Sequence, residues 1–307
     1  MRDVIAAVGV FDGTGVTDVW LVEHLEFMVL IAGQDVIEGD DGVFRIARQV
    51  APDRVISTVD REARHGHKSK SRRFDGFKAH IAEDPDGEII TDVVVTPANT
   101  PDADALDDLL TGGDNDEVKP VIYGDAGYGG ADVLERLDEA GYEFVIKVPS
   151  PSRRQGRWSK ADFGVDIDND TVTCPAGITV AISYSTDGSG AARFGTNCDS
   201  CPLREMCTTA QAGRTITIHR REDILQTQRF TQTTDPDWAA DYTGTRPKVE
   251  RKLAHLIRQP WGGRKGRMRG AARIAGDLIA RAATINLARL ANQGLTQTPN
   301  GWAVNPP

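Results

Sequence analysis

Four cysteines are the residues of this sequence whose spacing indicates a chemistry most clearly. Cys198 and Cys201 are two residues apart in NCDSCPLREMC, Cys207 ends the same segment, and Cys174 lies upstream in TCPAG. A Cys-x2-Cys turn can direct two thiolates at one ion, and four thiolates complete a tetrahedral zinc site. The spacing predicts a structural zinc site, with His219 as an alternative to Cys174. The other interpretation is four free thiols that pack as small hydrophobic side chains.

Two carboxylates stand in sequence contexts that are typical of catalytic groups. Asp125 ends the apolar run VIYGD and precedes AGYGG, and a carboxylate between a strand end and a glycine turn is a common catalytic arrangement. The simpler alternative is an Asx turn. Glu250 is the single acid among ten basic residues of segment 246–273. On a helix that begins near Pro247, Glu250 is either a surface salt-bridge partner of Arg246 or a metal ligand among cations that attract phosphate.

The charge of the chain is unevenly distributed. The net charge of −9 comes from 36 Lys and Arg against 45 Asp and Glu, yet residues 61–80 hold seven basic and two acidic side chains. Segment 246–273 holds ten and one. This segregation favours a polyanion such as DNA as partner. Neither segment interleaves the aromatic side chains that stack single-stranded bases, and no P-loop pattern supports a nucleotide-dependent enzyme.

Length and hydropathy narrow the class of protein further. The 307 residues suffice for one large domain or two ordinary ones. The longest apolar run, FMVLIA, is far too short to span a bilayer, and the N-terminus lacks the pattern of a signal peptide. We therefore expect a cytoplasmic protein without membrane contact, in which clustered cysteines indicate metal rather than disulfides.

Local patterns predict the elements that must position these residues. A helix is expected to end at Gly33 and a strand to end at Asp60, and two β-rich runs joined by DPDG predict a hairpin. A helix from about Asp102, a strand before Asp125 and a helix closed by Gly141 follow. This order predicts a mixed α/β sheet.

The second half of the chain is predicted to hold short strands around the cysteines, a helix near Pro247, and a last helix from about 271 to 291. The Pro- and Asn-rich end is predicted to be disordered. The expected division is 1–54, a partial N-terminal region; 55–149, the first part of the core; 150–233, a cysteine-bearing insertion; 234–292, the rest of the core; and 293–307, the tail.

The combination of these segments resembles a known family. STVDREARHGHKSKSRRFDGFKAHIA, then VIYGDAGYG, then the four-cysteine segment, then Tyr242-x3-Arg246-x3-Glu250 are similar to DDE transposases of bacterial insertion sequences that carry a cysteine-bearing insertion. The resemblance covers about residues 30–290. It implies an RNase H-like fold, a mixed sheet flanked by helices with a small β-rich zinc-binding insertion. It also implies that Asp125 is the second catalytic carboxylate and Glu250 the third.

The same resemblance implies cofactors and partners. Mg²⁺ or Mn²⁺ would serve strand cleavage and transfer in DNA transposition, on double-stranded transposon ends and in a homo-oligomer. Tyr242 and Arg246 would contact the phosphate near the cut. Basic side chains of the two segments would hold the DNA backbone without reading the bases. They are Arg61, Arg64, Lys68, Lys70, Arg72, Arg73, Arg264, Lys265, Arg267 and Arg269.

The sequence departs from the family at the first catalytic carboxylate. In the family, that aspartate lies on a first core strand, and a long helical region separates it from the equivalent of LIAGQDV, which only about thirty residues precede here. Asp12, in FDGT, and Asp60, at the end of VISTV, are the candidates. We therefore expect an N-terminally truncated transposase, either active or inactivated by loss of the first aspartate. The alternative is a non-catalytic remnant that binds DNA or a partner subunit.

Overall fold

The computed structural model describes residues 6, 9–10, 18–48, 51, 53–69, 71–110, 119–299 and 301–304. The chain forms two compact units. The first, here called the terminal unit, comprises Met1–Ile81, Val93–Pro101 and Leu256–Pro307. The second, the central unit, comprises Ala82–Asp92 and Asp102–His255. These boundaries differ from the five-part division expected from the sequence, which stays a prediction.

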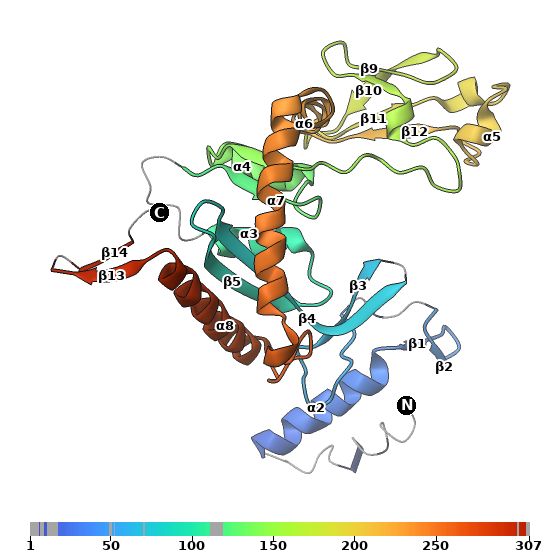
Figure 1. Ribbon diagram of the computed structural model, residues 1–307. Helices are drawn as coiled ribbons and strands as arrows, with labels where there is room; N and C mark the ends of the chain where they lie inside the picture. The colour runs from blue at the N-terminus through green and yellow to red at the C-terminus, as the bar shows by residue number, and fades with distance from the viewer. Residues whose placement is uncertain are drawn as a thin grey trace. The chain divides into compact units, whose positions relative to one another are not determined.

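The terminal unit begins with a helix and a small sheet (Figure 1). Helix α2 (Val19–Gly33) ends at Gly33 as predicted, and the Asp18 carboxylate accepts a hydrogen bond from the Leu21 amide at its first turn. Strands β1 (Val36–Glu38) and β2 (Phe44–Ile46) pair antiparallel. Helix α8 (Ala271–Asn292) agrees with the predicted last helix.

A three-stranded sheet follows in the order β3–β4–β5, formed by β3 (Arg64–Ser69), β4 (Arg72–Asp84) and β5 (Ile89–Pro97). Between β4 and β5 the Asp84 carboxylate accepts hydrogen bonds from the amides of Asp86 and Gly87, at 3.0 and 2.9 Å. These bonds close the turn that DPDG predicts. The predicted hairpin is therefore confirmed.

Two local predictions for this unit are wrong. Residues 55–60 form no strand, because the Ser57 hydroxyl accepts hydrogen bonds from the amides of Val59 and Asp60 and bends the backbone into a turn. The end of the chain, predicted to be disordered, contains the antiparallel strands β13 (Leu295–Thr298) and β14 (Gly301–Val304). Thr298 pairs with Gly301 and Leu295 with Val304, so this segment is ordered by backbone pairing despite its polar composition.

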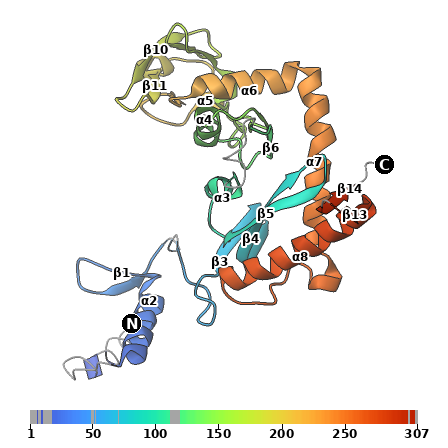
Figure 2. The same cartoon turned by 90° about the vertical axis from the view of Figure 1, so that its left-hand side faces the viewer.

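The central unit contains a β-α-β segment. Strands β6 (Ile122–Gly124) and β7 (Phe144–Ile146) are parallel, and helix α4 (Ala131–Glu139) connects them. Figure 2 labels the first strand, β6, and the helix, α4. A 3-10 turn η1 (Asp102–Ala105) leads into α3 (Leu106–Leu110), and α6 (Glu222–Thr234) packs on the same core. That core is centred on α4, whose Leu134 and Leu137 are almost completely buried. The strand predicted before Asp125 and the helix predicted to close at Gly141 are therefore confirmed as β6 and α4.

The cysteine-bearing segment folds as a five-stranded sheet of order β12–β11–β10–β9–β8, with its own core around Phe194, Val172 and Ile216. The paired strands are antiparallel. Two short helical turns and one short helix, η2 (Lys160–Asp162), η3 (Gly195–Cys198) and α5 (Arg204–Cys207), complete it. The strands are β8 (Gly164–Asp166), β9 (Thr171–Thr173), β10 (Thr179–Tyr184), β11 (Gly190–Arg193) and β12 (Thr215–Ile218).

Helix α7 (Pro236–Leu256) begins earlier than predicted, because Pro247 lies inside it rather than at its start. The Asp235 carboxylate accepts hydrogen bonds from the amides of Asp237 and Trp238, at 2.9 and 3.2 Å. An aspartate cap followed by proline is a stronger start signal than the isolated Pro247. After α7 the 3-10 turn η4 (Gln259–Trp261) leads towards α8.

The observed class is mixed α/β, as predicted, with several small sheets and surrounding helices. Within the part of the chain that the structure describes, no helix has the length and apolar character needed to cross a membrane.

Candidate active site

Asp125 lies where β6 ends, in a tight turn. Its Oδ1 accepts a hydrogen bond from the Gly127 amide at 2.8 Å, and the Tyr128 amide donates to the Asp125 carbonyl at 3.0 Å. The turn packs closely on the end of β7, since a Cβ on Gly129 would lie 2.3 Å from the Lys147 carbonyl oxygen. Asp125 therefore makes an Asx turn and also keeps 45% of its side chain exposed.

Helix α7 brings Glu250 to Asp125 through one arginine. The Arg246 Nη2 lies 3.2 Å from Asp125 Oδ2 and 3.5 Å from Glu250 Oε1. Arg246 and Glu250 are one helical turn apart, so they project from the same face. The structure thus joins two of the predicted site residues that are far apart in sequence, and a cationic group lies within 3.5 Å of both carboxylates.

Further contacts fix α7 beside β6 and order its aromatic residues. The Tyr123 hydroxyl donates a hydrogen bond to the Asp241 carboxylate at 2.9 Å. Tyr242, one turn before Arg246, stacks on Trp238 with ring centroids 5.2 Å apart and an interplanar angle of 6°. This stack orients the Tyr242 ring, whose contact with a DNA phosphate stays a prediction.

The β4–β5 turn supports the opposite face of α7. Lys248 Nζ donates to the Pro85 carbonyl at 2.9 Å, and Glu88 accepts ion pairs from Arg251 at 3.1 Å and Lys252 at 3.4 Å. Both carboxylate oxygens of the neighbouring Glu83 are buried and have no hydrogen-bond partner among the described residues. Burial raises the pKa of Glu83 to about 7, the positive charge of Lys252 opposes this rise, and the negative charge of Glu88 adds to it.

This raised pKa predicts a pH-dependent stability. The folded Glu83 carboxyl holds its proton up to about pH 7, whereas the unfolded one releases it near 4.5, so the free energy of unfolding falls as pH rises between these values. Glutamine does not titrate, so Glu83→Gln should not show this fall. The free energy of unfolding of Glu83→Gln minus that of wild type should therefore be about 2 kcal/mol larger at pH 8 than at pH 5. Urea unfolding at the two pH values measures this, with Glu139→Gln as an exposed control. If Glu83→Gln and wild type differed in free energy of unfolding by the same amount at both pH values, the prediction would be contradicted.

Asp102 is a further carboxylate near Asp125 that sequence analysis did not select. Both carboxylates lie near the point that a Cβ on Gly127 would occupy. Asp125 Oδ1 is 2.9 Å from that point and Asp102 Oδ2 is 3.0 Å from it. Burial raises the pKa of the adjacent Tyr128 hydroxyl, the charges of Asp102 and Asp125 raise it further, and Arg246 lowers it. In sequence Asp102 is one of several acids that begin a helix, and no local signal distinguishes it.

The two candidates for the first catalytic carboxylate have different outcomes. The Asp60 Oδ2 accepts a hydrogen bond from the Gly270 amide at 3.1 Å, and the Glu62 carboxylate accepts one from the Ala271 amide at 2.5 Å. Asp60 therefore caps the N-terminus of α8, where negative charge is favourable. Its assignment as a catalytic residue stays a prediction. Asp12 lies outside the described residues.

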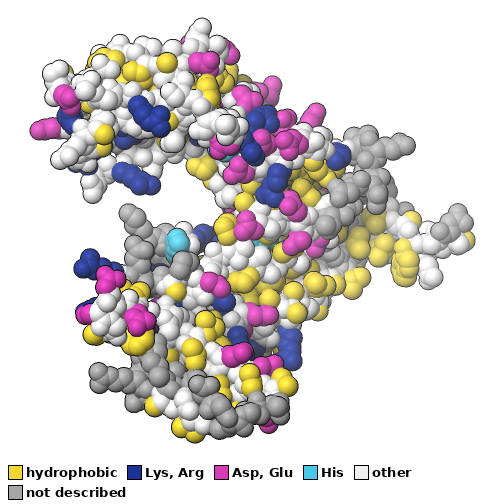
Figure 3. Space-filling view, turned by 180° about the vertical axis from the view of Figure 1, so that it is seen from behind, with side chains coloured by type: hydrophobic (Ala, Val, Ile, Leu, Met, Phe, Trp, Pro, Cys, Tyr) yellow, Lys and Arg dark blue, Asp and Glu magenta, His cyan; other side chains and the backbone are white. Residues whose placement is uncertain are grey.

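The predicted DNA-binding side chains divide by their contacts. Arg64 pairs with Asp53 at 2.6 Å and only 14% of its side chain is exposed, Arg267 pairs with Asp277, and the Arg61 guanidinium lies 3.9 Å from the Phe27 ring centroid. On the face in Figure 3, basic and acidic side chains lie side by side. Lys70 lies outside the described residues. The remaining predicted DNA contacts from the two basic segments are exposed: Lys68, Arg72, Arg73, Arg264, Lys265 and Arg269.

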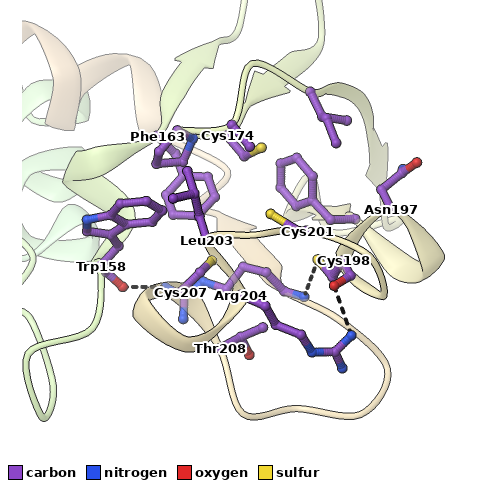
Figure 4. A pocket seen from close by; sticks show the side chains of 15 residues that line it. Trp158, Phe163, Cys174, Asn197, Cys198, Cys201, Leu203, Arg204, Cys207 and Thr208 are labelled. Atoms are coloured by element: carbon purple, nitrogen blue, oxygen red, sulfur yellow. Dashed lines mark hydrogen bonds between the residues drawn. The ribbon is translucent and has the colours of Figure 1, made fainter.

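The four cysteines line one small pocket of about 20 Å³ (Figure 4). The Arg214 amide donates to Cys198 Sγ at 3.4 Å, and burial raises the pKa of the Cys207 thiol. His219 interacts with Asp132 at 3.3 Å and does not line this pocket. Among the described residues, no three His, Cys, Asp or Glu side chains are arranged so that they could hold a metal ion. The arrangement does not support the predicted zinc site, which stays a prediction.

Comparison with known families agrees with this geometry. The family model described as the transposase DDE domain matches residues 40–287, which is more than half of the chain. The chain therefore belongs to the transposase DDE domain family. No curated protein and no solved structure matches it.

Proposed function

We propose that this protein is the transposase of a bacterial insertion sequence, which cleaves and transfers DNA strands in a reaction that depends on divalent metal ions. The observation that carries the proposal is the placement of Asp125 and Glu250 within 3.5 Å of one guanidinium nitrogen of Arg246. Family membership supports the transposase class. An RNase H-like core is the fold that we propose for the mixed α/β arrangement.

The residues around Asp125 fit divalent metal ions of the magnesium type. All donors are carboxylate oxygens, which Mg²⁺ and Mn²⁺ prefer, and the Arg246 guanidinium lies where a cation between Asp125 and Glu250 would be attracted. Bound there, such ions would activate the attacking oxygen and stabilise the leaving oxygen at phosphorus. The Arg246 guanidinium would then turn from the carboxylates to the DNA phosphate, to which it can donate two hydrogen bonds.

The DNA would lie over exposed basic side chains without base-specific contacts. Tyr242, oriented by Trp238, and Arg246 would contact the phosphate at the cut. Because Arg64 and Arg267 already have acidic partners, they would contribute less than the exposed Arg72, Arg73, Arg264 and Lys265. Assembly as a homo-oligomer and a cytoplasmic location stay predictions.

Strand nicking tests the proposed function directly. The full chain is incubated with a supercoiled plasmid that carries the ends of the element, with Mg²⁺ or Mn²⁺, and nicked circles are quantified on gels. We expect nicking that EDTA abolishes. Absence of nicking with both metal ions would overturn the proposed activity.

A second function is favoured by a separate observation. Asp60 caps α8, and among the described residues no three carboxylates converge on a metal position. Both facts agree with a non-catalytic remnant. Such a protein would bind either the transposon ends or a subunit of an intact transposase. Salt-sensitive binding of the ends without nicking, measured by fluorescence anisotropy, would support it.

We also propose that zinc, when bound, draws the four cysteine thiolates of the insertion into tetrahedral coordination. Support comes from their position around one pocket of about 20 Å³, roughly the space of one small ion or water. Elemental analysis of purified protein is expected to find one zinc per chain, lost in Cys198→Ser and kept in Asp199→Asn, whose carboxylate lies in the same turn. Stably folded, zinc-free wild-type protein would contradict this proposal.

A further inference from the structure

Asp102 and Asp125 face one another across a space that only glycine leaves open. Oxygens of both carboxylates lie within 3.0 Å of the point that a Cβ on Gly127 would occupy. Any larger side chain at this position would fill that space. Two like charges kept this close repel one another, and a cation between them removes the repulsion.

Asp125 has two oxygens with different surroundings. Its Oδ1 accepts the Gly127 amide hydrogen and lies on the side of Asp102. Its Oδ2 lies on the side of Arg246, which also contacts Glu250. Asp125 is therefore common to two carboxylate pairs, Asp102 with Asp125 and Asp125 with Glu250. A carboxylate common to two pairs has an oxygen available on each side for a cation.

The backbone holds both members of the first pair. Asp102 begins η1 directly after Pro101, and Leu106 and Leu110 of the following α3 pack on the core that also holds α4. Asp125 follows β6 in the same unit. Burial raises the pKa of the half-buried Tyr128 hydroxyl, the charges of both carboxylates raise it further and that of Arg246 lowers it, so all three groups act on this hydroxyl.

We propose that Asp102 is a metal ligand of this site, and that it binds a divalent cation together with Asp125. It would add a carboxylate to the pair formed by Asp125 and Glu250, whereas Asp60 caps α8. This inference rests on the proposed metal-dependent function. Mg²⁺ or Mn²⁺ bound by two carboxylates would complete its coordination with water and with phosphate oxygens of DNA.

Mn²⁺ binding to the full chain tests the inference without any measurement of activity. Electron paramagnetic resonance of free Mn²⁺ gives the dissociation constant. We expect Asp102→Asn to weaken binding roughly tenfold or more, as Asp125→Asn does, while Asp104→Asn, in the same 3-10 turn, changes it less than about twofold.

Gly127→Ala provides a second variant that keeps every carboxylate. Its Cβ would fill the space between the two oxygens, so the same loss of Mn²⁺ binding is expected. Gly130→Ala is the matched control, because a Cβ there meets no atom within 4 Å and its backbone, at φ −80° and ψ 148°, accepts alanine. Thermal unfolding of each variant shows whether it is folded.

The outcomes separate the inference from the proposed function. Wild-type binding in folded Asp102→Asn, with loss in Asp125→Asn, would overturn the role of Asp102 and leave the metal-dependent function intact. Should Asp102→Asn fail to fold, unchanged Mn²⁺ binding by Gly127→Ala would overturn it instead. Absence of Mn²⁺ binding by the wild-type chain would overturn both.

Discussion

Asp125→Asn is expected to reduce metal-dependent nicking of transposon ends on the order of 10³-fold, because the metal ion that Asp125 is proposed to hold would stabilise charge in the transition state by several kcal/mol. The substitution keeps the size of the side chain and the Gly127 hydrogen bond to Oδ1, so the turn after β6 should keep its shape. It removes the charge that attracts Arg246 at 3.2 Å. DNA binding should therefore stay equal or become tighter while nicking is lost.

Glu250→Gln should behave in the same way, and Asp237→Asn, on the first turn of the same helix, should keep wild-type nicking. Rates are compared under single-turnover conditions, with binding measured separately by anisotropy. A variant that lost binding and nicking together would indicate a structural defect. Nicking by Asp125→Asn or Glu250→Gln at the wild-type rate would remove that residue from the active site.

Leu134→Ala is expected to lower the free energy of unfolding by about 2–5 kcal/mol, the cost of removing a large apolar side chain from a closed core. Leu134 is completely buried on α4, among Leu137, Ile146 and other apolar side chains. The same helix follows the Asp125 turn directly, so this core also holds the turn in place. Urea denaturation followed by circular dichroism measures the loss.

The matched control is Leu287→Ala on α8, where 63% of the side chain is exposed. That substitution should change stability by less than about 0.5 kcal/mol. A loss below about 1 kcal/mol for Leu134→Ala would mean that the core around α4 is not closed. A comparable loss for both variants would mean that exposure does not determine the effect.

Much of the fold could be predicted where the signal is local. The hairpin after DPDG, the helix that ends at Gly33 and the strand that leads to Asp125 agree with the sequence, because turn chemistry and hydrophobic periodicity act within a few residues. The errors are also local in origin. Ser57 bends a segment with strand-like composition, and an aspartate cap starts α7 before Pro247.

By itself, the sequence indicated the class of this protein, predicted Asp125 and Glu250 as site residues, and located the basic segments that suit DNA. Only the tertiary structure decided how such side chains are used. It joined Asp125 to Glu250 through Arg246, engaged Asp60 and Arg64 in internal contacts, and brought Asp102 to Asp125. The physical reason is that side-chain type and spacing are properties of a short segment. Whether a charge faces a phosphate, a metal ion or an internal partner depends on residues that only folding brings within a few ångströms.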